Sequence, residues 1–378
     1  MTNNRVIVDF IAEITPSPTA PFSQAFEASP DGFLCTFRQG GTARLRPSLA
    51  GTTLLGIMEG RRQRKVPVYV EVSTDDTIVQ LLIPGIQKTS EVRESKSGGI
   101  EVVLFDSQVV HTLNRAGADY RVLLDALLEG RTNDRWLIVT ATDSHEIIHV
   151  VPLSPDDILG LPLPKPPNLF DRLRWWFGSV QFQVVRWWRL HLGVWLAATT
   201  YRRLPSLQNA SAMFNLVAAR SCDSTGMPSD CIPFLYPDAG CRARAHEMCR
   251  LITGAGLEPF KVWIYPGSAA DLRVRTSNSP ACAVAWGFHV APGLDVLTPD
   301  STWVTYVIDP SFFGGPVILA DWVASMNDPL ATTVVRDWPF YAPAIRDDFY
   351  VVTNHDLEDK RQLFRARCLA NGPPPYVC

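Results

Sequence analysis

The sequence lacks several features that would assign it to a specific class of protein. No block of basic residues is large enough to grip a phosphate backbone, and the formal net charge of the 378 residues is −3. No charge-free run approaches the roughly twenty residues that span a bilayer. There is also no internal repeat. These absences argue against nucleic acid as the main partner, against a transmembrane protein and against a repeat array.

The N-terminal stretch also lacks the pattern of a secretory signal peptide. Val6–Phe10 alternates like a strand, and the acids Asp9 and Glu13 lie where an apolar core and a small-residue cleavage site would be needed. Three explanations stay open: export by another route, removal of a signal from this sequence, or action inside a cell. The localisation is therefore not assigned by the residues.

One turn followed by a helix pattern holds the candidate nucleophile. The helix is predicted to begin near Cys241, after the turn that ends at Gly240, and to run for about four turns to Gly254. Its apolar positions recur at three- and four-residue intervals: Ala245, Met248, Cys249 and Ile252. A thiolate at a helix N-terminus is stabilised by unpaired N–H groups and the helix dipole, so we expect the pKa of Cys241 to be lowered.

Two strand patterns supply a base and an acid. Residues 281–290 alternate as one strand with His289 on its small-residue face, and Trp286 is expected to face away from His289 and support the site from behind. Trp303–Pro310 reads as a strand that must stop at the proline, which places Asp309 at its end. In this arrangement His289 would take the proton of Cys241, and Asp309 would orient the imidazole.

Each of these residues also has an ordinary structural explanation. A lone cysteine is usually a core residue or half of a disulfide, a strand histidine is often structural, and an aspartate before proline is common in turns. A metal site is the competing explanation for Cys241, His246 and Cys249, but no fourth ligand has zinc spacing. We therefore expect no metal and no cofactor.

From about Ser206 to Cys378 the chain resembles the bacterial protein-glutaminases, secreted enzymes that deamidate glutamine side chains in intact proteins and share a core with transglutaminases. The matching stretches are Met213-Phe214-Asn215, Ser221-Cys222, Cys231-Ile232-Pro233-Phe234, Tyr236-Pro237, Gly240-Cys241, Ala243-Arg244-Ala245-His246, Trp286, His289-Val290-Ala291, Ile308-Asp309-Pro310-Ser311 and Gly315-Pro316-Val317. The resemblance puts the catalytic triad on Cys241, His289 and Asp309. Tyr236, His246 and Trp286 are expected to contact substrate or support the site.

Upstream, the chain resembles more weakly the inhibitory pro-region of the same family. The likeness rests on a strand at Val102–Phe105, a helix at Asp119–Leu128 and two strands within Leu137–Asp157. In that family the pro-region covers the active-site cleft until it is cleaved away, so the resemblance implies a latent precursor.

The fold expected from these observations is α+β in four parts. A transglutaminase-like or papain-like core, with the nucleophile helix packed on an antiparallel sheet, occupies residues 206–378. It follows a β-rich domain at 1–95, a small α/β pro-region-like domain at 96–160 and a linker and connector at 161–205. The β-rich domain carries no motif and is equally explained as a targeting or docking domain or as an enlarged pro-region.

The cysteines suggest an oxidising compartment, and together with the family resemblance they favour a secreted or exported protein. Seven of the eight follow residue 220, and without Cys241 an even set compatible with three disulfides remains: Cys222, Cys231, Cys249, Cys282, Cys368 and Cys378. Cys222 to Cys231 and Cys368 to Cys378 are the nearest local pairs, although the sequence does not determine pairing. Cys35 is left over.

The connector is unusual in composition. A proline-rich stretch suited to an accessible linker, with Pro155, Pro162, Pro164, Pro166 and Pro167, precedes a segment that interleaves arginine with tryptophan. The interleaved residues are Arg172, Arg174, Arg186, Arg189, Arg202 and Arg203 with Trp175, Trp176, Trp187, Trp188 and Trp195. A helix on a membrane surface is one explanation. We prefer a connector whose tryptophans pack on neighbouring domains while the arginines reach water.

The function predicted from the sequence is hydrolysis of the side-chain amide of glutamine in proteins, through a thioester on Cys241 and with release of ammonia. The partners are then proteins or peptides that carry glutamine, and the chain's own pro-region. Lysine crosslinking and peptide-bond cleavage use the same triad and stay open. A disulfide-stapled toxin or adhesion module without catalysis is the alternative from another class.

Overall fold

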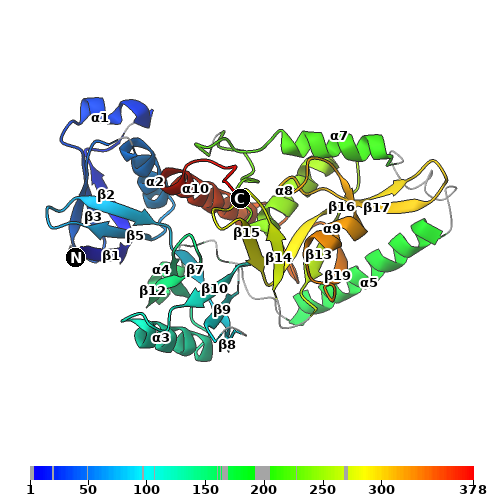
Figure 1. Ribbon diagram of the computed structural model, residues 1–378, viewed down its shortest axis with the longest axis horizontal. Helices are drawn as coiled ribbons and strands as arrows, with labels where there is room; N and C mark the ends of the chain where they lie inside the picture. The colour runs from blue at the N-terminus through cyan, green and yellow to red at the C-terminus, as the bar shows by residue number, and fades with distance from the viewer. Residues whose placement is uncertain are drawn as a thin grey trace. The chain divides into compact units, whose positions relative to one another are not determined.

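The computed structural model describes residues 4–18, 21–48, 50–95, 98–105, 107–159, 161, 163, 169–191, 205–226, 228–267 and 271–378. The chain divides into two compact units. Unit 1 holds residues 1–161 and 362–373, and unit 2 holds residues 162–361 and 374–378. Both units combine helices with small antiparallel sheets (Figure 1), so the predicted α+β class is confirmed. Among the described helices, none has the length and apolar character required to cross a membrane.

The first part of unit 1 contains two three-stranded sheets and one long helix. One sheet has the order β1-β5-β6 and the other β2-β3-β4. Burial alternates along β3, with Cys35 completely enclosed between two buried phenylalanines, as expected for a strand with one face in a core. The elements are β1 (Arg5–Asp9), β2 (Ile11–Thr15), η1 (Phe22–Gln24), α1 (Ala25–Ala28), β3 (Phe33–Phe37), β4 (Thr42–Leu45), α2 (Gly51–Gln63), β5 (Val68–Val72) and β6 (Ile78–Leu82).

The second part of unit 1 has its own core beneath the helix α3 (Tyr120–Thr132). Its sheets have the orders β10-β9-β8 and β12-β11-β7. The predicted strand, helix and two strands are present as β9, α3, β11 and β12, and the boundary expected after residue 95 lies in the turn between β8 and β9. The strands and the last helix are β7 (Gly85–Gln87), β8 (Thr89–Glu94), β9 (Ile100–Leu104), β10 (Val110–Leu113), β11 (Leu137–Ala141), β12 (Ile147–Pro152) and α4 (Pro155–Ile158).

Unit 2 is built around a five-stranded antiparallel sheet with the order β18-β17-β16-β13-β19. The helix α8 (Cys241–Gly254) packs against β16 and β13, and α7 (Leu207–Ala218) packs against α8. The sheet strands are β13 (Phe260–Tyr265), β16 (His289–Leu297), β17 (Trp303–Val307), β18 (Val317–Ile318) and β19 (Thr332–Asp337). The other elements are α5 (Leu169–His191), β14 (Leu272–Arg275), β15 (Ala283–Trp286), α9 (Leu319–Ser325), β20 (Phe340–Ala342), β21 (Ile345–Arg346) and α10 (Val351–Asn371), which continues into unit 1.

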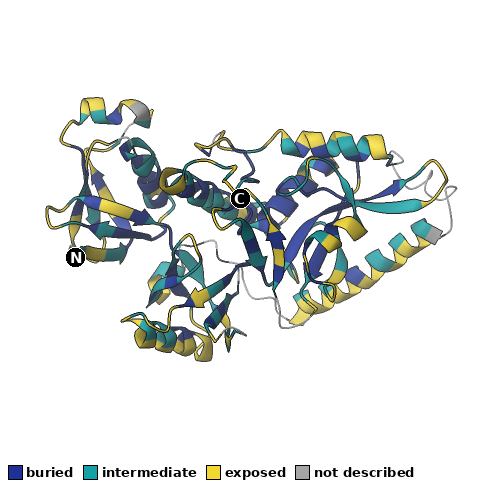
Figure 2. Cartoon of the chain, in the orientation of Figure 1, coloured by how far each residue is buried: buried dark blue, intermediate teal, exposed yellow. Residues whose placement is uncertain are grey.

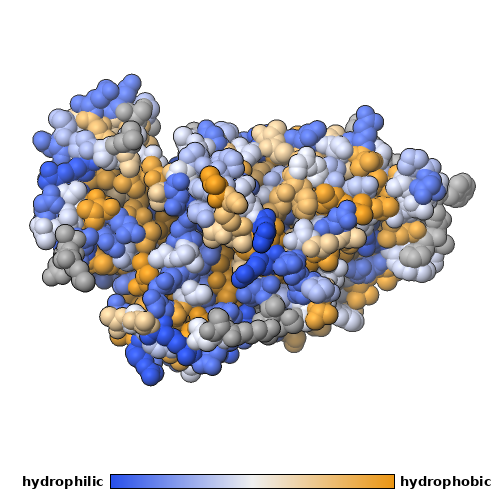
Figure 3. Space-filling view, viewed as in Figure 1, coloured by the Kyte–Doolittle hydropathy of each residue, from blue (hydrophilic) through white to orange (hydrophobic). Residues whose placement is uncertain are grey.

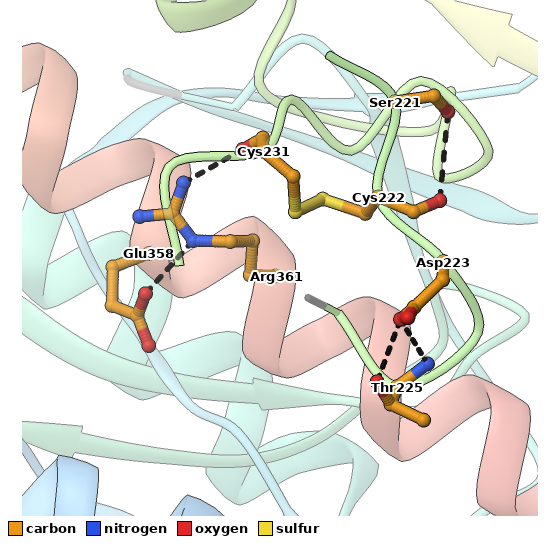
Figure 4. The surroundings of a disulfide bond; sticks show 7 residues. All are labelled: Ser221, Cys222, Asp223, Thr225, Cys231, Glu358 and Arg361. Atoms are coloured by element: carbon orange, nitrogen blue, oxygen red, sulfur yellow. Dashed lines mark hydrogen bonds and ion pairs between the residues drawn. A yellow bond between two sulfur atoms is a disulfide. The ribbon is translucent and has the colours of Figure 1, made fainter. Parts of the chain in front are cut away.

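One predicted disulfide is confirmed and one is wrong. Cys222 and Cys231 are bonded, and Arg361 on α10 fastens their loop by donating to the Cys231 carbonyl at 2.8 Å while pairing with Glu358 at 2.9 Å (Figure 4). Cys378 bonds to Cys282 instead of to the nearer Cys368.

The pairing of Cys378 follows from backbone contacts that spacing does not reveal. The N–H of Tyr376 donates to the carbonyl of Ser277 at 2.7 Å, which holds the C-terminal residues beside the stretch that contains Cys282. Cys249 and Cys368 are in no disulfide, so two bridges replace the expected three. Burial raises the pKa of the leftover Cys35 to about 12, which makes it an unreactive core residue.

Several residues of the predicted linker and connector lie outside the described part of the chain, namely Pro162, Pro164, Pro166, Pro167, Trp195, Arg202 and Arg203. The helix α5 is present within the predicted connector.

Candidate active site

The helix α8 begins at Cys241, as the sequence predicts. Its N-cap is Gly240, which has a φ of 82°, in the left-handed region that favours glycine. A side chain at this position would also meet Lys360, whose Cγ lies 2.6 Å from where the added Cβ would be. The glycine is therefore required by the turn that delivers Cys241 to the start of the helix.

Arg244 holds that turn in place. Its buried guanidinium donates to the carbonyl oxygens of Tyr236 at 3.0 Å, Ala239 at 2.5 Å and Pro237 at 3.3 Å. Three hydrogen bonds from one planar cation fix the backbone immediately before the candidate nucleophile. The sequence analysis had treated Arg244 only as part of the matching stretch, since a side chain that binds backbone carbonyls leaves no pattern in the sequence.

His289 and Asp309 form a buried hydrogen-bonded pair. Nε2 of His289 lies 2.9 Å from Oδ2 of Asp309, and the indole N–H of Trp322 donates to the same oxygen at 3.0 Å. Burial acts to raise the pKa of Asp309, but His289, Trp322 and Arg244 together bring it below its usual value. The carboxylate is therefore ionised, and it holds the proton of His289 on Nε2.

This tautomer leaves Nδ1 of His289 as the basic nitrogen. Nδ1 is buried and has no hydrogen-bond partner among the described residues. A buried imidazole nitrogen with a lone pair and no donor is able to accept a proton from a neighbouring acid.

Three aromatic rings fix the plane of His289. Trp286 stacks on the imidazole with ring centroids 4.5 Å apart, Trp322 lies on it at 5.7 Å, and Phe312 contacts its edge at 5.8 Å. Trp322 is a site residue that sequence reasoning missed, because it lies on α9 and has no periodic relation to Asp309.

The predicted orientation of Trp286 is wrong. The sequence analysis placed Trp286 and His289 on opposite faces of one strand. In the structure Trp286 ends β15, which pairs with β14, whereas His289 begins β16 in the five-stranded sheet. The chain passes from one sheet to the other between them, so strand alternation does not apply. The indole of Trp286 donates to the carbonyl of Asp238 at 3.0 Å, which leaves its ring face on the imidazole.

Cys241 lies beside the residue that follows His289. A backbone hydrogen bond joins the thiol to Val290, and Cys241 packs in a small cluster with Ala245, Trp263 and Val290. Only 1% of Cys241 is exposed. The start of α8 therefore lies beside the start of β16, the strand that begins with His289.

The expected lowering of the Cys241 pKa is wrong for this state of the protein. Burial raises the pKa to about 12, and the opposing effects of Arg244, Arg242 and the Val290 hydrogen bond do not offset it. The helix N-terminus stabilises a thiolate, but loss of water costs more when the sulfur is fully enclosed. The thiol shown here is protonated.

His246 is placed for support of the helix. It lies in a buried cluster, with Nδ1 2.8 Å from Nζ of Lys261 and its ring near Trp338, Tyr341 and Tyr350. Burial and Lys261 lower the pKa of His246 to about 3, so the imidazole is neutral. No group of three or more metal-ligating side chains occurs among the residues that the structure describes.

An open cleft begins next to the aromatic rings. Its volume is about 1220 Å³, and its lining includes Phe312, Phe313, Arg273, Arg275 and the Cys282–Cys378 disulfide. Phe312 belongs both to the cleft wall and to the contacts of His289. Strongly hydrophilic side chains gather over β14, where the two arginines are exposed (Figure 3).

Residues 210–326 match the family model described as Glutaminase. This part of the chain is similar to the glutaminase family. The matched segment contains Cys241, His289 and Asp309, and the predicted resemblance to protein-glutaminases is confirmed. No curated protein matches the sequence significantly.

Solved structures of protein-glutaminases resemble the chain. The crystal structure of pro-protein-glutaminase is 20% identical, covers 78% of this chain and 97% of its own, and has a TM-score of 0.50. The NMR structure of protein-glutaminase from Chryseobacterium proteolyticum is 29% identical over 40% of this chain and 84% of its own, with a TM-score of 0.35. The likeness to the pro-protein shows a shared α+β fold.

Proposed function

We propose that the protein deamidates glutamine side chains in proteins, with Cys241, His289 and Asp309 as the catalytic triad. The observation that carries the proposal is the buried hydrogen-bonded pair of His289 and Asp309. Nδ1 of His289 lacks a hydrogen-bond partner among the described residues. Cys241 lies at the start of a helix within the segment that matches the glutaminase family model. The proposed core is transglutaminase-like, with the nucleophile helix on an antiparallel sheet.

The proposed first half-reaction forms a thioester. Nδ1 of His289 takes the thiol proton, and the sulfur of Cys241 attacks the carboxamide carbon of glutamine. The oxyanion is stabilised by backbone N–H groups, including that of Cys241 at the start of α8. The imidazolium then gives its proton to the departing nitrogen, which leaves as ammonia. Asp309 stabilises the positive imidazole during this step.

The second half-reaction restores the enzyme. His289 removes a proton from water, which attacks the thioester and releases glutamate, and the proton returns to the sulfur. If a lysine amine replaced the water, the product would be a crosslink, so access of water to the thioester distinguishes the two activities.

We further propose that the intact chain is a latent precursor. Residues 96–160 would act as the inhibitory pro-region, and cleavage between residues 155 and 205 would release the catalytic part. The enclosed, protonated thiol of Cys241 supports a resting state that needs activation.

The proposal predicts little ammonia release by the intact chain and strong release after proteolytic nicking between residues 155 and 205. A glutamine-rich denatured protein serves as substrate, ammonia is measured enzymatically, and mass spectra record a gain of about one unit per event. Equal rates before and after verified nicking would reject latency. Crosslinked products in place of the mass gain would indicate lysine crosslinking, and new peptide termini would indicate peptide-bond cleavage.

The charge of the cleft predicts a preference for acidic sequence around the target glutamine. Arg273 and Arg275 project from β14 and have no ion-pair partner among the described residues. Peptides with glutamate on both sides of the glutamine should have a kcat/KM about tenfold above that of lysine-flanked peptides, since two exposed ion pairs contribute about 0.7 kcal/mol each. The nicked protein and a matched peptide pair provide the measurement.

Charge reversal tests this preference. Arg273→Glu/Arg275→Glu should invert the ratio between the two peptides. The matched control is Arg172→Glu/Arg174→Glu, which makes the same change of net charge on exposed positions of α5 and should leave the ratio unchanged. If the ratio of kcat/KM between the two peptides did not change in the β14 variant, Arg273 and Arg275 would have no role in substrate recognition.

A further inference from the structure

The helix α5 turns apolar side chains toward solvent along its whole length. The preferred sequence interpretation, in which the tryptophans pack on neighbouring domains, is wrong for Trp176, Trp187 and Trp188, which are 56%, 53% and 52% exposed. Phe170, Leu173, Phe177, Val180 and Val184 are also exposed, and exposed positions follow one side of α5 in Figure 2. Their spacing of three and four residues makes a continuous stripe on one face of the helix.

Polar contacts fix the opposite face of α5 to unit 2. Arg186 makes two hydrogen bonds to the carboxylate of Asp295, at 2.8 and 2.7 Å, and one to Thr305 at 2.9 Å. Gln183 donates to the carbonyl of Val335 at 2.7 Å. These contacts involve the buried Asp295 and the edge strand β19, so they set the rotation of the helix about its axis.

Large apolar side chains lie on both the inward and the outward face of α5. A surface helix normally buries its apolar stripe against the core and exposes its charges. In α5 the inward face carries the bidentate ion pair of Arg186 together with Trp175 and Phe182, which contact Arg336 and Phe260, whereas the exposed apolar stripe faces outward. The inward contacts fix the rotation of the helix, so they also determine that the apolar stripe faces solvent. An exposed apolar surface of this kind is typical of a binding site for an apolar partner.

The charges of α5 identify the kind of partner. Arg172 and Arg174 flank the stripe, are exposed and have no ion-pair partner among the described residues. Apart from Arg186, which pairs with Asp295, the helix carries three arginines and one acid, Asp171. Pairing of two copies of α5 would bring like charges together, whereas an anionic lipid surface would attract them. Tryptophan and arginine are also the side chains that the interface between acyl chains and headgroups favours.

We propose that α5 docks the protein on the surface of an anionic lipid bilayer. The 23-residue helix would lie in the plane of the membrane, with its tryptophans and phenylalanines at the level of the headgroups and with Arg172 and Arg174 beside lipid phosphates. The arginines along its length exclude a spanning orientation. This inference does not depend on the proposed catalytic activity.

The test is co-sedimentation of the full chain with vesicles of phosphatidylcholine alone and of phosphatidylcholine with phosphatidylglycerol. Binding is expected to the anionic vesicles, to weaken with salt, and to fall at least about tenfold in Trp176→Gln/Trp187→Gln/Trp188→Gln. Arg172→Gln/Arg174→Gln should weaken binding to anionic vesicles and leave the weak binding to neutral vesicles unchanged. Brominated lipids should quench tryptophan fluorescence in the unaltered chain and less in the triple variant.

The matched control is Leu330→Gln/Phe349→Gln, which removes apolar side chains of similar or greater exposure elsewhere in unit 2 and should retain binding. Circular dichroism establishes that each variant is folded. Equal sedimentation of the unaltered chain and the triple tryptophan variant would overturn the proposal. The proposal would also be overturned if the protein did not bind vesicles and sedimentation velocity showed a dimer that the same tryptophan substitutions dissociate. The partner of α5 would then be a second copy of the chain.

Discussion

Cys241→Ala is expected to abolish ammonia release by the nicked protein, with a fall in kcat of at least about a thousandfold. Without the sulfur there is no thioester, and water would have to attack a poorly activated amide directly. The assay measures ammonia and the one-unit mass gain on the same denatured substrate. Because the side chain lies in a cluster with Ala245, Trp263 and Val290, the fold of the variant is checked by thermal unfolding.

Cys249→Ala provides the matched control for this experiment. Cys249 lies on the same helix, is equally buried and is in no disulfide, and burial raises its pKa to about 12 as well. It differs in its surroundings, since it lies near Lys261 and away from the helix start. The Cys249 variant should keep its activity. Activity that survived in Cys241→Ala, or that was lost equally in both variants, would contradict the assignment of the nucleophile.

Asp309→Ala should lower kcat by about 10² to 10⁴ and leave KM little changed. The substitution removes the anion that keeps the proton on Nε2 of His289 and that stabilises the imidazolium. The buried Nε2 and the indole N–H of Trp322 would both lose their acceptor, so the imidazole would lose the hydrogen bond that fixes its orientation. Steady-state kinetics of the nicked protein, with kcat and KM determined separately, provide the measurement.

Trp322→Phe separates orientation from charge. It removes one of the hydrogen bonds to Oδ2 of Asp309 and keeps an aromatic ring on the face of His289. We expect a loss of less than about tenfold in kcat, because the carboxylate and its bond to Nε2 remain. If the phenylalanine variant were as inactive as Asp309→Ala, the packing around His289 would matter more than the charge of Asp309.

The start of the nucleophile helix could be predicted because its causes are local. A glycine able to adopt positive φ precedes Cys241, and the apolar residues after it recur with the period of a helix. The end of the strand before Asp309 follows in the same way from Pro310, which has no N–H to donate. The three proposed catalytic residues were therefore found from their neighbours in the sequence and from the family resemblance.

Other features of the site depend on contacts between distant parts of the chain. The stacking of Trp286 on His289 arises because the chain changes sheets between them, and alternation within one predicted strand gave the opposite orientation. The pKa of Cys241 depends on how completely β13 and β16 exclude water from the helix start, which no property of the helix reveals.

The sequence by itself determined the α+β class, the resemblance to protein-glutaminases, the start of α8 and the place of Asp309 at a strand end, since each rests on short-range backbone preferences or on a local motif. Only the tertiary structure decided the Cys282–Cys378 bond, the three carbonyls bound by Arg244 and the outward stripe of α5. Those three depend on which atoms meet after the chain has folded. The composition of α5 favoured a packed connector, but its rotation was set by the ion pair between Arg186 and Asp295, two residues far apart in the sequence.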